Sequence, residues 1–241
     1  MVSAMGSPYP PRISVVIPAR NAESYLGEAL DSVLAQEDVE LDAIVVDDAS
    51  TDRTAEVAAG YAPRGIRLLR RDKRGGAGAA RNDGIAAALG PWLAFLDADD
   101  LWPAGRLNRL LQLLGRSGGP DIAFGHASHF LCPRLDPEAR RRLRCPAAPT
   151  PGHGAGGMLI ALAAFRAVGP FVENLGTGEF LDWLGRARDK GLREATIPDI
   201  VLERRIHCSN HTLLNRDERV EYIRVLKRTL DRRRTAQDSS T

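Results

Sequence analysis

The first half of the chain alternates short apolar runs with amphipathic segments. Runs rich in Val, Ile and Leu are typical of buried strands, and apolar residues recurring every three or four positions are typical of helices. The predicted strands are residues 13–17, 43–46, 66–69 and 92–96, and the predicted helices begin at Asn21, Ser50 and Ala79, with a fourth along Leu107, Leu110, Leu111 and Leu114. Asn21 is a suitable N-cap. This order predicts an α/β fold with a Rossmann-like, mostly parallel central sheet flanked by helices.

The second half of the chain is less regular. Residues 133–157 are rich in arginine, proline, alanine and glycine, and are predicted to form a basic excursion or mobile loop. Strand-like segments lie at residues 121–124, 126–131, 158–160, 195–198 and 201–205, and helices around Phe165 and Val168 and at residues 179–190 and 220–233. Residues 1–11 and 235–241 are expected to be a disordered leader and tail. We therefore expect one domain, residues 12–234, with halves at residues 12–118 and 119–234.

Two of the predicted strands end in carboxylates. The fourth strand continues directly into Asp97, Asp99 and Asp100, and the second into Asp47–Asp48. Ligands of a doubly wound sheet bind beyond the carboxyl ends of its strands, and two Asp side chains separated by one residue can turn toward one hard cation such as Mg²⁺ or Mn²⁺. The alternative is that these carboxylates only cap the following helix. Because two acidic strand ends coincide, we favour a site, with Asp100 in a structural role.

The charge balance excludes some classes of function. With 33 basic and 31 acidic side chains the net charge is +2, so the chain as a whole offers no electrostatic case for binding nucleic acid. Two stretches, residues 134–144 and 224–234, are locally basic. Such stretches fit a phosphate, peripheral contact with an anionic membrane, or solubility alone, and plain solvation is the simplest interpretation of the second.

The cysteines and the apolar runs indicate a cytoplasmic protein. Cys132, Cys145 and Cys208 lie far apart and form no CxxC pair, so the sequence suggests neither a zinc site nor a disulfide framework. Reduced thiols in the cytoplasm are the simplest interpretation. No run approaches the ~18 apolar residues of a membrane-spanning helix, and the N-terminus lacks the pattern of a secretory signal.

Four ordered motifs resemble a known enzyme family. They are Ile17-Pro-Ala-Arg-Asn21, Val46-Asp-Asp-Ala-Ser-Thr-Asp52, Gly78-Ala-Ala-Arg-Asn-Asp-Gly84 and Phe95-Leu-Asp-Ala-Asp-Asp100. In this order and spacing the chain resembles the family 2 glycosyltransferases, which have the GT-A fold. The resemblance is strong over residues 12–114 and looser at residues 157–160, 168–171 and 178–183.

The resemblance implies transfer of a sugar from a nucleotide diphosphate donor, most often a UDP-sugar, to an acceptor that the sequence does not identify. The reaction would invert the anomeric carbon in a single displacement assisted by Mn²⁺ or Mg²⁺. Residues 12–118 would bind the donor, and residues 119–234 would supply acceptor contacts and the base. By position, Pro18, Ala19 and Asn21 would lie along the nucleoside, Asp48 at the base, Arg81 beside the base or ribose, Asp97 at the ribose or metal, and Asp99 at the metal. For Arg81, a structural ion pair is the alternative.

The catalytic base is the point at which the chain departs from the family. Relatives commonly carry Glu-Asp where this chain has Glu179 followed by Phe180. That leaves Glu179, which we prefer, or Asp182 as candidate base. The alternative for either residue is a carboxylate that only stabilises the start of a helix. His207 is a candidate third metal ligand or phosphate contact, although a lone His is more often structural.

Two alternative functions are judged from the glycine-rich segments and from Phe180. Gly75–Gly78 matches neither nucleotide-binding glycine motif, so we expect a flexible turn there. A nucleotidyltransferase would need a glycine-rich, Lys-containing loop after the first strand, and residues 18–21 offer none. The replacement at Phe180 keeps open a protein that binds nucleotide sugars without catalysis.

Overall fold

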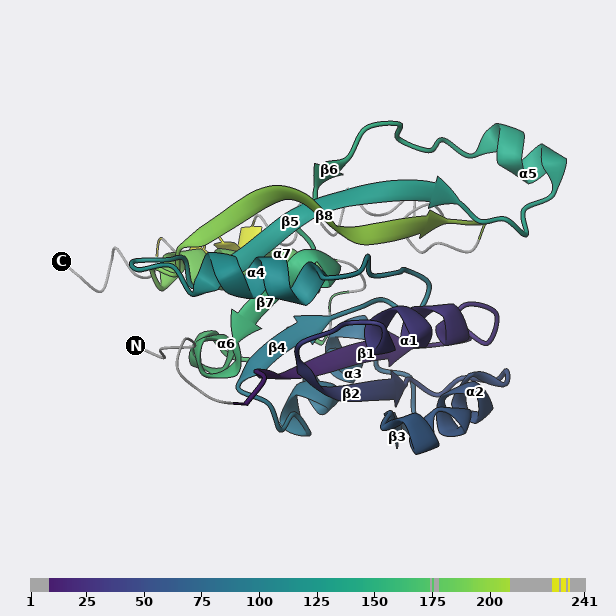
Figure 1. Ribbon diagram of the computed structural model, residues 1–241, viewed down its shortest axis with the longest axis horizontal. Helices are drawn as coiled ribbons and strands as arrows, with labels where there is room; N and C mark the ends of the chain where they lie inside the picture. The colour runs from purple at the N-terminus through teal and green to yellow at the C-terminus, as the bar shows by residue number, and fades with distance from the viewer. Residues whose placement is uncertain are drawn as a thin grey trace.

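A sheet of eight strands forms the centre of the computed structural model (Figure 1). The structure describes residues 9–173, 175, 178–208, 227–229, 231–232 and 234. Within this part of the chain the strand order is β3-β2-β1-β4-β7-β5-β6, and β8 pairs along β5. None of the described helices has both the length and the apolarity needed to span a bilayer.

The N-terminal half is a parallel α/β unit. Its strands are β1 (Arg12–Ala19), β2 (Glu40–Asp47), β3 (Arg67–Arg70) and β4 (Trp92–Phe95), and its helices are α1 (Leu26–Leu34), α2 (Thr54–Gly60), the short 3₁₀ helix η1 (Ala62–Arg64), α3 (Gly76–Ala86) and α4 (Arg106–Leu114). Both β2 and β4 pair with β1 in parallel, and β3 pairs with β2 in parallel. The carboxyl ends of these strands therefore share one edge, so Asp47–Asp48 and Asp97–Asp100 leave the sheet on the same side, as predicted.

The C-terminal half extends the same sheet and makes it mixed. Its elements are β5 (Ile122–Leu131), α5 (Pro137–Arg142), β6 (Thr150–Pro151), η2 (Ala155–Gly157), β7 (Met158–Ala161), α6 (Leu162–Val168), α7 (Glu179–Asp189) and β8 (Glu194–Ile206). Strand β7 lies antiparallel between β4 and β5, whereas β8 runs parallel to β5. The predicted α/β class is confirmed.

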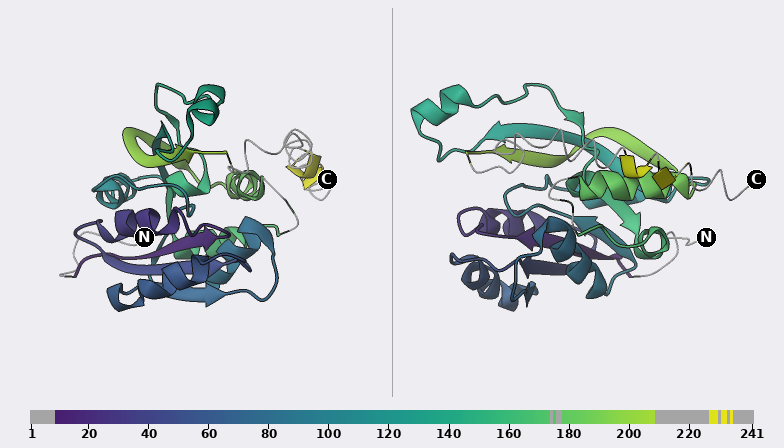
Figure 2. Two further views of the ribbon diagram at one scale, coloured as in Figure 1. Left: turned by 90° about the vertical axis from the view of Figure 1, so that its right-hand side faces the viewer. Right: turned by 180° about the vertical axis from the view of Figure 1, so that it is seen from behind.

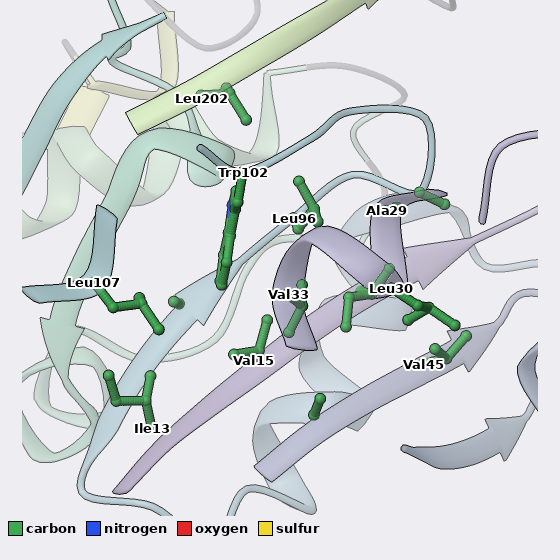
Figure 3. Packing of buried hydrophobic residues seen from close by; sticks show 14 of the residues in the cluster. Ile13, Val15, Ala29, Leu30, Val33, Val45, Leu96, Trp102, Leu107 and Leu202 are labelled. Atoms are coloured by element: carbon green, nitrogen blue, oxygen red, sulfur yellow. The ribbon is translucent and has the colours of Figure 1, made fainter. Parts of the chain in front are cut away.

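Two apolar clusters cover the two faces of the sheet. Ile13, Val15 and Ile17 of β1 pack with helices α1, α2 and α4, and Val16 packs on the other side with α3, α6 and α7. Figure 3 shows part of the first cluster, with Val15, Leu30 and Trp102 among its labelled members. Side chains alternate across a strand, and both faces of β1 are buried, so its sequence reads as a continuous apolar run.

Two local predictions about loops are wrong. Asn21 does not cap α1, which begins at Leu26; instead Asn21 has φ 48°, and its Oδ1 accepts a hydrogen bond from the Thr51 amide at 2.9 Å. Asn adopts this left-handed conformation readily and bonds to nearby backbone, which removes it from the helix. Gly75–Gly78 is not a flexible turn, because Gly76–Gly78 form the first turn of α3.

Other boundaries shift without changing the fold. Residues 121–124 and 126–131 form one strand, β5, with a register irregularity around Gly125–Ala127, and residues 195–198 and 201–205 form the single strand β8. In α4, Leu113 joins Leu107 and Leu110 in the buried stripe, while Leu111 and Leu114 are partly buried. The predicted final helix at residues 220–233 lies largely outside the described residues, although residues 227–229 and 231–232 are helical. The predicted tail, and residues 1–8 of the predicted leader, lie wholly outside them.

Candidate active site

Asp97 and Asp99 emerge from the end of β4 and point to different partners. Asp97 Oδ1 accepts a hydrogen bond of 2.6 Å from Arg81 Nη2, and Asp99 Oδ2 lies 2.9 Å from His207 Nε2. Their side chains keep 42% and 29% of their surface exposed. Both carboxylates therefore remain accessible at the edge of the sheet, and each has its own protein partner.

Arg81 connects the two halves of the chain. It lies on α3, is almost fully buried, and donates to Glu179 Oε1 at 2.5 Å as well as to Asp97. Burial disfavours its charged form, but the carboxylates of Asp97 and Glu179 outweigh burial and raise the pKa of Arg81 above its usual value. Arg81 therefore forms an ion pair, its place beside the base or ribose stays a prediction, and the pair brings Glu179 beside the acidic end of β4.

The close approach of α7 to α3 depends on Gly78. A Cβ at this position would lie 3.2 Å from the Val172 carbonyl oxygen and 3.4 Å from Glu179 Cγ. The distance to the carbonyl oxygen is tighter than ordinary packing and would require a shift of a few tenths of an ångström, whereas the distance to Glu179 Cγ is an ordinary van der Waals contact. A larger residue would therefore crowd the backbone just before α7. The small residues of this motif therefore have a packing function.

Asp182, the second candidate base, is fully buried among arginines. Its carboxylate lies 2.9 Å from Arg186 Nε, 2.8 Å from Arg232 Nη1 and 3.5 Å from Arg228 Nε. These contacts join α7 to the helical residues near the C-terminus. Asp182 consequently makes no contact with Asp97, Asp99 or Arg81 in the described structure.

Asp48 is buried and holds the start of α3. Its oxygens accept hydrogen bonds from the Gly75 and Gly76 amides at 2.7 and 2.8 Å, and Arg71 Nε lies 3.1 Å away. Gly76 has φ 85°, a left-handed value that favours glycine. Sequence reasoning missed this role, because it treated the carboxylate and the glycines as separate features.

A cavity of about 360 Å³ lies beside Asp48 and is lined by Ala49, Ser50, Arg70, Arg71 and Asp72. Pro18 and Ala19, at the end of β1, pair in register with Val46 and Asp47. The exposed Asn21 amide donates to Ser50 Oγ at 3.0 Å, which ties the loop after β1 to the wall of the cavity. Pro18, Ala19 and Asn21 therefore lie next to the segment that forms one wall of the cavity, although none of them lines it.

Three residues not singled out from the sequence support the acidic end. Arg205, almost fully buried, donates from its amide to Asp100 Oδ1 at 2.9 Å, from Nε to the Asp99 carbonyl at 2.8 Å and from Nη2 to Glu28 Oε2 at 2.7 Å. The Tyr25 ring lies 4.6 Å from the His207 ring. The cluster of arginines before His207 was the available signal, but nothing in the sequence pairs Arg205 with Glu28.

Asp100 has the structural role that we expected. It is buried, and burial together with the carboxylates of Asp99 and Asp97 raises the pKa of Asp100 well above its usual value. The hydrogen bond from the Arg205 amide fixes it in place. Asp100 therefore anchors the loop after β4 and leaves the exposed positions to Asp97 and Asp99.

The oxygen donors at this edge fit a divalent cation of the Mg²⁺ or Mn²⁺ type. Among the described residues, no group of three His, Cys, Asp or Glu side chains is assembled as a ready ligand set. Such a cation needs only one or two protein carboxylates when phosphate oxygens and water complete its shell. Asp97 and Asp99 satisfy that requirement, and His207, in contact with Asp99, adds an imidazole nitrogen that Mn²⁺ accepts.

Comparison with known proteins decides the family. Residues 14–156 match the family described as Glycosyl transferase family 2. The chain belongs to this family. It is 39% identical over 108 residues to the succinoglycan biosynthesis protein ExoO of Rhizobium meliloti, covering 45% of this chain and 31% of that protein. It is 28% identical over 233 residues to the uncharacterized glycosyltransferase RT0329 of Rickettsia typhi, covering 89% and 71%.

Solved structures of other glycosyltransferases share the fold of this family 2 chain. S. aureus TarS 1–349 in complex with UDP-GlcNAc gives a TM-score of 0.69 at 21% identity, over 85% of this chain and 61% of that one. The mannosyltransferase PcManGT from Pyrobaculum calidifontis, in complex with GDP-Man and Mn²⁺, gives 0.66 at 22% identity, over 93% and 64%. The predicted GT-A fold is confirmed. The chain spans about a third of the length of ExoO and about three fifths of the TarS fragment.

Proposed function

We propose that this chain transfers a sugar from a nucleotide diphosphate donor to an acceptor, with inversion at the anomeric carbon. The observation that carries the proposal is the buried Arg81, which holds Glu179 beside Asp97 at the carboxyl edge of the sheet. The sheet edge at which ligands of α/β folds bind thus carries both a polar cavity and a paired carboxylate. A UDP-sugar is the first donor to test, because TarS binds UDP-GlcNAc, and a GDP-sugar is the second, because PcManGT binds GDP-Man.

The nucleoside would occupy the cavity beside Asp48. Pro18, Ala19 and Asn21 would lie along it, and Asp48 would contact the base. The Asp48 carboxylate already accepts from the Gly75 and Gly76 amides. A carboxylate has about four lone-pair positions, so one further contact to a base N–H is compatible with these bonds.

Asp97, Asp99 and His207 would hold Mn²⁺ or Mg²⁺. Bound there, the metal would neutralise the charge that develops on the departing diphosphate. The presence of Mn²⁺ in the PcManGT complex supports this choice. Asp97 would in addition contact the ribose, and Arg81 would keep Asp97 oriented from the protein side.

Glu179 is the preferred base. It would take the proton from the acceptor hydroxyl while the acceptor oxygen bonds to the anomeric carbon and the bond to the diphosphate oxygen breaks, its electron pair leaving with the diphosphate. Among the described contacts, Arg81 engages only Oε1 of Glu179, which leaves Oε2 to receive the proton. Asp182 is the weaker candidate, because its carboxylate lies within 3.5 Å of three guanidinium groups and has no exposed surface.

A second candidate function is binding of nucleotide sugars without transfer. Phe180, which stands where relatives carry an acidic residue, is buried, with its ring centroid 6.2 Å from that of Phe124 and 6.3 Å from that of Trp183. At this position the chain therefore has an aromatic side chain packed in the core in place of a carboxylate. This replacement is what favours binding without transfer. Formation of free nucleoside diphosphate from a bound donor separates the two candidates, since only a transferase releases it.

Thermal unfolding with Mn²⁺ and a panel of nucleotide sugars tests the proposal. A ligand that binds the folded state raises its stability in proportion to RT ln(1 + [L]/Kd), so a true donor raises Tm progressively with its concentration. We expect this for at least one UDP- or GDP-sugar. A Tm that no nucleotide sugar raises above that of the protein with Mn²⁺ alone would contradict the proposal.

We place the protein in the cytoplasm, where its three unpaired cysteines would stay reduced.

A further inference from the structure

Residues 133–149, which we call the arginine arm, project from the body of the protein at the end of β5 (Figures 1 and 2). The helix within the arm, α5, has no buried residue. It is held by local bonds alone: Asp136 Oδ1 accepts from the Glu138 and Ala139 amides at 2.9 and 2.8 Å, and Pro137 occupies the first turn. The arm is therefore an ordered projection that adds nothing to the core.

The root of the arm is fixed beside the candidate active site. Arg134 Nη2 donates to Glu28 Oε1 at 2.7 Å, and Arg134 Nη1 donates to the Ser24 carbonyl. The Arg134 guanidinium also lies 5.7 Å from the centroid of the Tyr25 ring, which packs on His207. Whatever binds the arm is thereby brought close to the end of β4.

The arm carries five arginines, Arg134, Arg140, Arg141, Arg142 and Arg144, against two carboxylates, Asp136 and Glu138. All five are exposed. Arg142 pairs with Glu138 at 2.5 Å, whereas Arg141 and Arg144 have no ion pair or hydrogen bond within the described structure. The arm thus presents a net positive charge that the protein itself does not neutralise.

The other basic stretch, at residues 224–234, is used differently. Arg228 and Arg232 lie 3.5 and 2.8 Å from the buried Asp182 carboxylate, and Arg232 lies 3.6 Å from Asp189. Those two cations pair with carboxylates of α7, one of which is fully buried. Lys227, Arg228 and Arg234 are also exposed, but the arm differs in carrying its exposed arginines on a projection that adds nothing to the core.

We propose that the arginine arm docks the protein on an anionic lipid bilayer. Clusters of four to eight basic residues bind anionic headgroups, at ~1 kcal/mol for each cation near the surface. A convex, projecting helix fits a plane, whereas a soluble polymer is held best in a groove. The large exposed apolar side chains of the described structure, Tyr9, Leu89 and Leu181, all lie outside the arm, so attachment is electrostatic and reversible.

Docking through the arm goes beyond the proposed transferase activity, and its test needs no turnover. The full chain is mixed with phosphatidylcholine vesicles that contain or lack phosphatidylglycerol, and the bound fraction is measured by sedimentation at increasing salt. We expect binding only to the anionic vesicles, falling steeply with salt. Binding that is equal on both kinds of vesicle, or absent from both, would overturn the proposal.

Matched variants locate the contact. Replacing Arg141, Arg142 and Arg144 together by Gln is expected to weaken vesicle binding roughly 100-fold, on the basis of the contribution of each cation. Replacing the exposed Arg53, Arg116 and Arg166 by Gln removes the same charge elsewhere and is expected to leave most of the binding. Equal losses in both variants would refute the role of the arm. Binding of soluble polyphosphate by the wild-type chain without binding to anionic vesicles would show an anionic polymer as the partner and also refute it.

Discussion

Arg81 donates a hydrogen bond of 2.5 Å to Glu179, which lies 98 positions later in the chain. The second terminal nitrogen of the same guanidinium, Nη2, donates to Asp97 at 2.6 Å. One buried cation thus joins α3, the end of β4 and the start of α7. The relative position of the candidate base and the candidate metal ligand depends on this residue.

Replacement of Arg81 by Leu is expected to lower the free energy of unfolding by about 3 kcal/mol or more, because removing one partner of a buried ion pair leaves uncompensated charge. Urea denaturation measures the change. Arg81→Lys keeps the charge but not the two-pronged geometry, so an intermediate loss is expected. A Leu variant as stable as the wild type would show that the pair contributes nothing to the fold.

Replacement of Asp182 is expected to change stability, whereas replacement of Glu179 is expected to change turnover. Asp182→Asn is expected to cost about 2 kcal/mol of stability, since it weakens the charged hydrogen bonds that a fully buried carboxylate receives from partly exposed arginines, while affinity for the donor stays unchanged. Urea denaturation and calorimetric titration with the donor measure the two quantities. Unchanged stability together with abolished turnover would instead identify Asp182 as the base.

Asp48→Ala is expected to lower stability by about 1 to 2 kcal/mol, because it removes the acceptor for two amides at the start of α3. It is also expected to weaken donor binding, since Arg71 beside the cavity loses one of its two carboxylate partners and keeps only Asp83. Asp72→Ala removes an exposed carboxylate from the same cavity and is the control, with an effect within about 0.5 kcal/mol. Equal stability losses in the two variants would contradict the capping role of Asp48.

How much the sequence predicts depends on how local each feature is. The strand ends at Asp48 and Asp97 followed from apolar runs that continue into carboxylates, and the sheet brought them to one edge. Neither the Arg81–Glu179 pair nor the Arg205–Glu28 contact could be predicted, because each depends on which distant elements pack together. Asn21 was misassigned because its side chain bonds to a neighbouring loop rather than to its own helix.

Asp42, which lies outside the candidate active site, predicts how the stability of the protein depends on pH. Burial opposes ionisation, but hydrogen bonds from Ser14 Oγ, the Leu89 amide and Arg67 outweigh it and lower the pKa of Asp42 below the usual 3.8. A carboxyl with a lowered folded-state pKa stabilises the protein above its unfolded-state pKa, and this contribution is lost as pH falls through the folded-state pKa. The stability difference between the wild type and Asp42→Asn is therefore expected to be largest at neutral pH and to shrink on acidification. Urea denaturation measures the difference in free energy of unfolding between the two proteins. A difference that does not change with pH would contradict the lowered pKa of Asp42.

The most direct test of the account is the turnover of Glu179→Gln compared with its affinity for the donor. The variant is expected to bind the stabilising nucleotide sugar about as well as the wild type and to release nucleoside diphosphate roughly 10²- to 10⁴-fold more slowly, which is the usual loss when a general base is removed. Glu173→Gln, an exposed carboxylate near Asn82, is the matched control and is expected to retain turnover. Turnover of Glu179→Gln at the wild-type rate would contradict the central claim that Glu179, held by Arg81, is the base of this site.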